Sequence, residues 1–527
     1  MDAYKLTATQ VLDKYKSDEL TVEQYAESLL AHVRSRDPTV KAWAYLEPEL
    51  VLAQARALDQ LPKDKRGPLH GVAIGVKDVI YTKDMPTAYN SPIYDNNFPK
   101  VDAASIQILR HAGALIFGKT TTTEFAATVV GPSTTNAHSA KRTPGGSSAG
   151  SGAAVGDLQV PLALGTQTGG STIRPGSFNG IYALKPTWGA ISREGQKLYS
   201  LILDVLGLYA RSTADLDLLA EVFDLHDDEA SSFQGVTGAK FAFCKTPNWD
   251  HAGQGTMNAL EKAVSLLRSH GATVEELVLP EAFDKVTLWH HIILAGDGHA
   301  AFLPDYRTNK DHLDQFLQGH AERIGGWTRK QQLEAFDGIA NLRPVLDEIA
   351  GRYEAIIVPS VPDEAPEGLE STGSAIFNSM WTALHTPVVN IPGFKGANNM
   401  PIGLSLVAPR YRDRHLLKML VYPIAILALT GAALAAPATS ATNFTDVNVY
   451  SKASGYKPCI IRQPKCCPSN IVGFTLSGPP TLKCVDPEST KSQSKFLSSC
   501  EENNLIPYCC TPEIPLIGSR CRRILKE

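Results

Sequence analysis

Residues 143–189 read TPGGSSAGSGAAVGDLQVPLALGTQTGGSTIRPGSFNGIYALKPTWG, and this stretch decides the fold. Two loops rich in Gly and Ser flank the apolar run at residues 160–164. Small residues let backbone N–H groups converge on one substrate atom. An oxyanion hole needs this arrangement, and each such donor contributes a rate factor of about 10²–10³. A flexible linker would not carry an apolar strand between its halves, so we interpret the stretch as catalytic.

Short apolar runs alternate with helical patterns on both sides of this stretch. Apolar spacing typical of helices occurs at 6–36, 103–111, 214–223 and 257–270, and Thr21 with Gln24 fits a capping box. Strand candidates are residues 71–76, 113–118, 160–165 and 353–360. Strands interleaved with helices predict the α/β fold class, with helices layered on a sheet.

The central stretch resembles the amidase signature family. The family pattern is a GGSS-type loop, a GT-x-x-GGS loop and a downstream Pro, Phe, Gly and Lys-Pro series. Here these are residues 145–148, residues 165–171, Pro175, Phe178, Gly180 and Lys185-Pro186. Similar motifs extend the resemblance over roughly residues 5–418: GPLHGVAIGVKDVI (67–80), GKTTTTEFA (118–126), GLYARSTADLDLLA (207–220) and TPVVNIPG to DRHLLK (386–418).

The resemblance implies a mixed β-sheet flanked by helices and an amidohydrolase that acts on a small-molecule linear amide. It implies Ser171 as the nucleophile, Ser147 as a bridging serine in a cis peptide, and Lys77 as the base. With the amide of Ser171, the oxyanion hole would use the backbone N–H groups of Thr168, Gly169 and Gly170. No metal and no cofactor is expected, because the relay needs none and no cluster with metal-ligand spacing occurs.

The implied base has a physical requirement. A lysine in water has a pKa of about 10.4, and a base working near neutrality needs a pKa lower by roughly two to three units, at a cost of about 3–4 kcal/mol. The apolar strand VAIGV that precedes Lys77 can supply the desolvation. Neutral Lys77 would then accept the Ser147 proton while Ser147 accepts that of Ser171.

The sequence departs from the family pattern beside the triad. Gln167 stands where many members have Asp, the order Thr172-Ile173-Arg174 shifts the arginine by one place, and Asn179 replaces a frequent Cys. These departures leave substrate preference open. They also argue against the glutamyl-tRNA amidotransferase A-subunit branch of the family.

Two other motifs suggest different chemistry. Residues 113–120 fit the P-loop pattern, but their centre is an apolar strand candidate where a phosphate loop would need a tight turn. Residues 146–150 fit the nucleophile elbow of Ser-His-Asp α/β-hydrolase esterases, but HSAKRTP precedes them where that elbow needs an apolar strand. The esterase is the alternative for the N-terminal part; a secreted interfacial protein with an inactive amidase part is another.

Charge and cysteine usage bound the setting of the protein. The formal net charge is −4 over 527 residues, which gives no basis for nucleic-acid binding. Of nine cysteines, only Cys244 precedes residue 459. The long part nearly free of Cys is typical of the cytoplasm, and the short Cys-rich part is typical of an oxidised, secreted module.

Residues 419–436, MLVYPIAILALTGAALAA, form an uncharged run between these parts. The run follows basic residues, begins with Met and contains the small-x-small sequence Ala433-Leu434-Ala435, so it predicts a secretory signal. Asn443 then begins a glycosylation acceptor. The alternative is the buried last helix of the preceding domain.

The last eight cysteines follow the order C-x6-CC-x16-C-x15-C-x8-CC-x10-C. Eight cysteines allow 105 pairings, which the sequence alone cannot choose between. The two CC doublets resemble those of fungal hydrophobins. That resemblance implies a small disulfide-rich β-barrel, found in the cell wall or secreted, that self-assembles at interfaces. The implied pairs are Cys459–Cys509, Cys466–Cys500, Cys467–Cys484 and Cys510–Cys521.

We therefore expect three parts: an amidase domain at 1–418, the apolar segment at 419–436 and a hydrophobin-like domain at 437–527. The favoured hypothesis is two unrelated proteins in one chain through a merged gene model. The other is a real fusion in which 419–436 is a membrane signal-anchor, with the amidase in the cytoplasm and the hydrophobin-like part outside.

Overall fold

The structure is a computed structural model that describes residues 2–421, 463–467, 506–510 and 521–523. The chain divides into two units, the first comprising Met1–Ala321 and Trp327–Ala438, the second Glu322–Gly326 and Thr439–Glu527.

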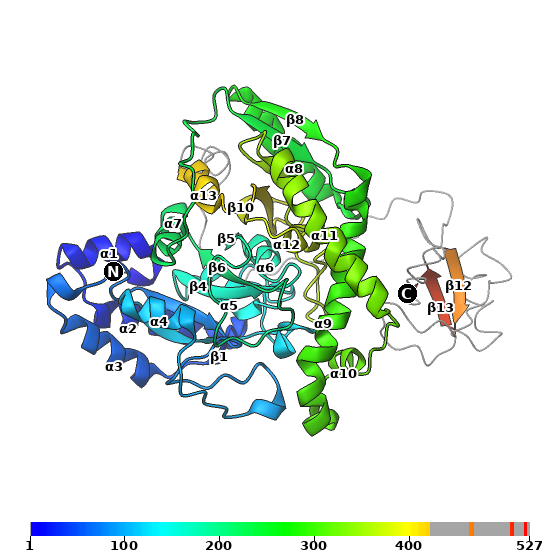
Figure 1. Cartoon of the computed structure of the whole chain (residues 1–527). Helices are drawn as coiled ribbons and strands as arrows, with labels where there is room; N and C mark the ends of the chain where they lie inside the picture. The colour runs from blue at the N-terminus through cyan, green and yellow to red at the C-terminus, as the bar shows by residue number, and fades with distance from the viewer. Residues whose placement is uncertain (1, 422–462, 468–505, 511–520, 524–527) are drawn as a thin grey trace, which may run out of the picture. The chain divides into compact units, whose positions relative to one another are not determined.

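An eleven-stranded mixed sheet forms the centre of the first unit, in the order β1-β3-β2-β4-β6-β5-β10-β11-β9-β7-β8 (Figure 1). Strands β2, β3 and β4 pair in parallel, as do β7, β8 and β9, and antiparallel pairs join these groups. The strands are β1 Trp43–Tyr45, β2 Ala73–Lys77, β3 Leu115–Thr120, β4 Leu162–Gln167, β5 Tyr182–Lys185, β6 Val205–Ala210, β7 Lys240–Cys244, β8 Thr273–Leu277, β9 Ile356–Pro359, β10 Val388–Lys395 and β11 Pro401–Val407.

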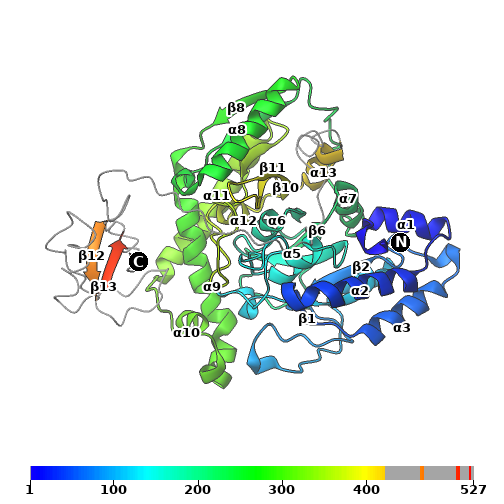
Figure 2. The ribbon, with the colours of Figure 1, turned by 180° about the vertical axis from the view of Figure 1, so that it is seen from behind.

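Helices cover both faces of this sheet, as Figures 1 and 2 show from opposite sides. The α-helices are α1 Ala8–Lys16, α2 Val22–Val40, α3 Pro48–Asp59, α4 Ala104–His111, α5 Ala149–Gly156, α6 Ile173–Phe178, α7 Thr213–Val222, α8 Gln254–Ser269, α9 Val286–Asn309, α10 Gln315–Ala321, α11 Arg329–Ala350, α12 Ser379–Ala383 and α13 Asp413–Val421. Short 3-10 helices are η1 Ala3–Lys5, η2 Lys63–Lys65, η3 Pro92–Tyr94, η4 Glu124–Ala126, η5 Trp249–His251, η6 Glu281–Lys285 and η7 Lys310–His312.

Two hydrophobic cores lie on the two faces because strand side chains alternate in direction. In β4, Leu162 and Leu164 belong to one core and Ala163 to the other. Helices α4, α7, α8 and α13 contribute to the first core, and α2, α3, α5 and α11 to the second. The predicted α/β class with a mixed, helix-flanked sheet is confirmed for this unit.

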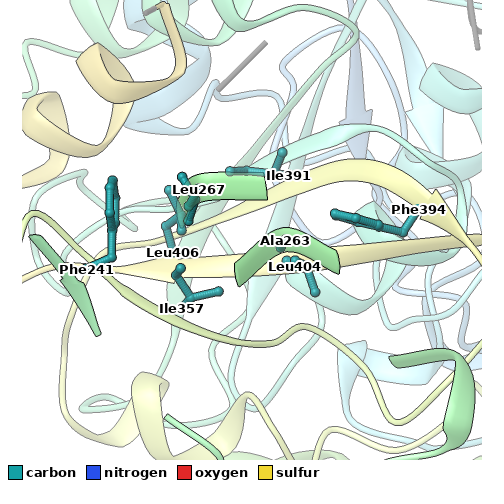
Figure 3. A pocket seen from close by; sticks show the side chains of 8 residues that line it. All are labelled: Phe241, Ala263, Leu267, Ile357, Ile391, Phe394, Leu404 and Leu406. Carbon is teal, nitrogen blue, oxygen red and sulfur yellow. The ribbon is translucent and has the colours of Figure 1, made fainter. Parts of the chain in front are cut away.

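A small apolar pocket lies in the first core beneath α8, where the helix crosses the sheet (Figure 3). Its lining is entirely hydrophobic: Phe241, Ala263, Leu267, Ile357, Ile391, Phe394, Leu404 and Leu406. All eight side chains belong to the first core, so the pocket is a packing gap and carries no polar group for chemistry.

Helix α13 ends three residues beyond the boundary expected at Lys418. Met419 and Leu420 are buried in the first core, with 0% and 3% of their surface exposed. The start of the predicted signal segment therefore packs in the amidase unit. Among the residues that the structure describes, no helix is long and apolar enough to cross a membrane. The secretory signal, the membrane anchor and the domain boundaries all stay predictions.

The second unit contains a three-stranded antiparallel sheet of β12 Gln463–Cys467, β13 Ile506–Cys510 and β14 Cys521–Arg523. Backbone register places Cys510 opposite Cys521. Asn443, Cys459, Cys484 and Cys500 lie outside the described residues. The β-barrel, the four pairings and the glycosylation site stay predictions, whereas Cys244 is a buried free thiol of the first unit.

Candidate active site

The fold brings Lys77 and the two Gly/Ser loops to one end of the sheet. Lys77 is the last residue of β2, which runs parallel to β4, and the second loop follows the end of β4. The first loop leads into α5, which packs on β4. The C-terminal ends of parallel neighbours meet at one edge, so the second loop lies near Lys77. The contact of Lys77 with Ser147 brings the first loop to the same place.

Lys77 is wholly buried between two hydroxyl groups. Its Nζ is 2.7 Å from Ser147 Oγ and 2.7 Å from Thr166 Oγ1. Burial lowers the pKa of Lys77 well below 10.5, the nearby charge of Asp204 raises it in part, and Arg174 lowers it further. The amine is thus disposed toward its neutral form, as a base requires.

Ser147 is also buried, and a cis peptide bond joins Gly146 to it. The Gly146 carbonyl accepts hydrogen bonds from Arg174, whose Nε is 3.2 Å away and whose second terminal nitrogen also contacts it. Arg174 donates as well to the Gly373 carbonyl at 2.8 Å. Arg174, which is shifted by one place from the arginine of the family pattern, therefore holds the loop that carries Ser147.

Ser171 is half-buried at the end of the second loop. Its carbonyl accepts from the Ser148 amide at 3.4 Å and from the Tyr209 hydroxyl at 3.3 Å. Within residues 2–421 its own hydroxyl has no protein hydrogen-bond partner, so the expected Ser147–Ser171 link of the relay is not formed in this structure. The Lys77–Ser147 link of the relay is formed.

The other two serines of the first loop bind the backbone. Ser148 Oγ donates to the Thr166 carbonyl at 3.2 Å, and Ser151 Oγ donates to the Leu164 carbonyl at 2.8 Å. Both hydroxyls therefore fix α5 onto β4. This leaves Ser147 as the loop serine in contact with Lys77.

The amides expected to form the oxyanion hole are free of internal bonds. In the described part of the chain, the N–H groups of Thr168, Gly169, Gly170 and Ser171 donate to no protein acceptor. Gly170 has no room for a side chain, since a Cβ would lie 2.4 Å from Asn378 Oδ1. Unpaired N–H groups in a row are what an anionic oxygen requires.

Two departures from the family pattern serve to fix this region. Gln167 Oε1 accepts from the amides of Thr172 at 2.9 Å and Ile173 at 3.0 Å, and so caps the start of α6. Asn179 Nδ2 donates to the Pro144 carbonyl at 2.8 Å, just before the first loop. Both side chains bind the backbone and neither contacts Ser171.

Asp204 was missed by sequence reasoning. It is fully buried, and its Oδ1 accepts from the Thr168 hydroxyl at 2.7 Å. Burial raises the pKa of Asp204 to about 6. The signal was a single carboxylate in the apolar run LILDVLGLYA at 201–210, which in a buried strand region demands a specific partner.

The P-loop interpretation fails on local structure. Residues 115–120 form β3, a fully buried strand, and Lys119 binds Asp78 at 3.0 Å. A phosphate loop would need free amides and an accessible lysine.

Among the described residues, no group of three or more His, Cys, Asp and Glu side chains is placed to hold a metal ion.

The comparisons with known proteins agree on one family. The model of the family described as Amidase matches residues 24–417. The glutamyl-tRNA(Gln) amidotransferase A-subunit of Streptomyces avermitilis is 35% identical over 79% of this chain and 94% of its own. That of Carboxydothermus hydrogenoformans is 28% identical over 80% and 96%.

Solved structures give the same result. A protein described as an amidase superposes with a TM-score of 0.72 at 26% identity, covering 80% of this chain and 100% of its own. Fatty acid amide hydrolase has a TM-score of 0.72 at 21% identity over 81% and 86%, which is a likeness of fold. The chain therefore belongs, through residues 24–417, to the amidase signature family of hydrolases that act on C–N bonds.

Proposed function

We propose that this protein hydrolyses small linear amides through an acyl-enzyme on Ser171. The observation that carries the proposal is the wholly buried Lys77 at 2.7 Å from Ser147, beside a loop with four amides that donate to no acceptor in the described part of the chain. A buried amine with a lowered pKa, a hydroxyl to bridge and an oxyanion hole are the parts of a serine hydrolase that needs no histidine.

The steps follow from these positions. Neutral Lys77 accepts the Ser147 proton as Ser147 accepts that of Ser171, and the Ser171 oxygen attacks the amide carbonyl. The loop amides stabilise the tetrahedral oxyanion. Its collapse breaks the C–N bond, and the relay returns the proton to the leaving nitrogen. Water, deprotonated by the same relay, then hydrolyses the ester to release the acid and regenerate Ser171.

A second candidate is the role of a glutamyl-tRNA(Gln) amidotransferase A-subunit. The observation in its favour is the name shared by the curated relatives, one of them 35% identical over 94% of its length. The departures from the family pattern at Gln167, Thr172–Arg174 and Asn179 argue against that branch. The distinguishing feature is whether the chain by itself, with no partner protein, turns over simple amides.

The test is ammonia release by the purified full chain from hexanamide, benzamide and glutamine. We expect turnover of a simple amide without any partner and none by Ser171→Ala. Turnover of glutamine alone would favour the amidotransferase role. For the Ser-His-Asp alternative, no single histidine replacement should abolish turnover, and complete loss of turnover with one of them would support that esterase.

For residues 437–527 we propose a hydrophobin-like module that assembles at air–water interfaces. The order of the eight cysteines supports it, as does the register that sets Cys510 opposite Cys521. Non-reducing peptide mapping should find the Cys510–Cys521 bond and three others, and the module should lower surface tension. Eight free thiols in secreted material would overturn the proposal.

A further inference from the structure

Three consecutive carbonyls of the second loop are each held by a different element. The Thr168 carbonyl lies 2.8 Å from His290 Nε2 on α9. The Gly169 carbonyl accepts from the Thr382 hydroxyl on α12 at 2.8 Å. The Gly170 carbonyl accepts from the Arg174 amide on α6 at 3.0 Å.

These anchors determine where the loop amides point. In a planar trans peptide, the carbonyl and the following N–H point in opposite directions. Holding the carbonyls of Thr168, Gly169 and Gly170 therefore turns the amides of Gly169, Gly170 and Ser171 away from their anchors. These are the amides that donate to no protein acceptor within the described residues.

We propose that His290 and Thr382 are positioning residues for amide hydrolysis, which orient the oxyanion hole through the carbonyls of Thr168 and Gly169. The inference rests on the proposed function, because it assigns a task to the loop beside Ser171. Neither residue belongs to the Gly/Ser-rich segment, and His290 lies more than a hundred positions beyond it.

Gln167 directs the single proton of Thr382. Because Gln167 Oε1 accepts two amide hydrogens, its Nε2 must face Thr382, which it reaches at 3.0 Å. A hydroxyl that accepts from Gln167 has its one hydrogen free for a carbonyl. The Gly169 carbonyl, 2.8 Å from the Thr382 hydroxyl, is closer to it than the Asn378 carbonyl at 3.2 Å. An Asp at 167, with acceptors only, would compete for that hydrogen.

The state of His290 follows from its partner. A carbonyl only accepts, so Nε2 carries the hydrogen and Nδ1 carries none. Nδ1 is buried, and within the described residues it has no hydrogen-bond partner. Burial, with a smaller effect of neighbouring His291, lowers the pKa of His290 to about 3, which keeps the ring neutral.

The experiment compares Thr382→Val with Thr382→Ser in the full chain. Val keeps the shape and removes the donor, whereas Ser restores it. The matched control is Thr386→Val, which removes a similarly buried hydroxyl that donates to the Trp381 carbonyl at 3.2 Å. Readouts are kcat and KM on the fastest amide of the panel, and inhibition by the matching aldehyde and alcohol.

An aldehyde forms a tetrahedral adduct with a serine and uses the oxyanion hole, whereas the alcohol does not. We expect Thr382→Val to lower kcat by about 10- to 100-fold. Aldehyde affinity should fall by a similar factor, because it follows stabilisation of the transition state. Alcohol affinity and KM should stay unchanged. Thr382→Ser should recover most of the loss, and Thr386→Val should show none.

His290→Phe should behave as Thr382→Val does, and His290→Gln, which keeps a donor, should recover part of kcat. Equal losses of aldehyde and alcohol affinity, or a Thr382→Val variant indistinguishable from Thr386→Val, would overturn the positioning role while leaving the hydrolase intact. A wild-type chain that turns over no amide and binds the aldehyde no better than the alcohol overturns the proposed function instead, and the positioning role with it.

Discussion

Lys77 has no carboxylate partner in contact with it, and its two close neighbours are the hydroxyls of Ser147 and Thr166. A carboxylate in contact raises the pKa of a buried lysine, as Asp78 does for Lys119, whose pKa burial lowers. The absence of an ion pair at Lys77, among the contacts the structure describes, thus favours the neutral amine that the proposed relay requires of its base.

Substitutions of the triad should separate chemistry from folding. We expect Ser171→Ala to abolish amide hydrolysis and Lys77→Ala to reduce kcat by orders of magnitude, because the first removes the nucleophile and the second the proton acceptor. Circular dichroism should show both variants folded. Near-wild-type turnover by Ser171→Ala on any accepted amide would contradict the assignment.

The pH dependence should report the charge of Lys77. The protonated amine cannot accept a proton, so kcat/KM should be low below the Lys77 pKa and rise as pH increases through it. Since burial lowers this pKa, the midpoint of the rise in kcat/KM should lie well below pH 10.5. The Asp204 charge raises the Lys77 pKa, so Asp204→Asn should shift the acidic limb to lower pH. A limb that moves to higher pH would contradict this account.

The sequence motifs point to Lys77, Ser147 and Ser171 as the proposed triad, but not to the residues that surround them. Lys77, Ser147 and Ser171 stand in short motifs with characteristic neighbours. His290 and Thr382 act on single carbonyls across the fold, and a lone His or Thr on a helix gives no local signal for such a contact. Of these surrounding residues, only Asp204 had a local sequence signal, because it is an isolated carboxylate in an apolar run.

At the scale of elements, apolar runs and helical spacing predicted four of the eleven strands of the large sheet and part of the helices. The four strand candidates correspond to β2, β3, β4 and β9, and the capping box at Thr21 starts α2. The other seven strands of the eleven-stranded sheet were not predicted; in β10, for example, Asn390, Pro392 and Gly393 interrupt the apolar pattern that marks a strand.

Helix α13 gives a stability prediction. Met419 and Leu420 are buried in the core, so Met419→Ala and Leu420→Ala should each lower the free energy of unfolding by about 2–5 kcal/mol. Leu333→Ala, at a site 54% exposed on α11, is the control and should stay within about 0.5 kcal/mol. Thermal inactivation of the full chain measures both. If Met419→Ala and Leu333→Ala inactivate alike, the packing of α13 is misplaced.

At the scale of the whole molecule, the division of cysteines predicts two separable proteins. Residues 1–421 expressed alone should hydrolyse amides as the full chain does, because the sheet, both loops and α13 lie within them. Turnover by the isolated part is compared with that of the full chain. Loss of activity on removal of residues 422–527 would show that the amidase depends on the second part.

The same hypothesis predicts the natural product. Two proteins in one chain imply an amidase and a separate secreted protein that begins near Ala436, resolved by intact mass. A single natural chain of 56.9 kDa would favour a real fusion.

The central claim is the acyl-enzyme on Ser171, and rapid-quench intact-mass analysis with peptide mapping tests it most directly. Mixed with an amide it turns over, the full chain should gain the mass of the acyl group on the peptide that contains Ser171, and the adduct should disappear as product forms. Ser171→Ala should gain no mass. An adduct on another residue, or steady turnover with no adduct and full activity in Ser171→Ala, would contradict the account.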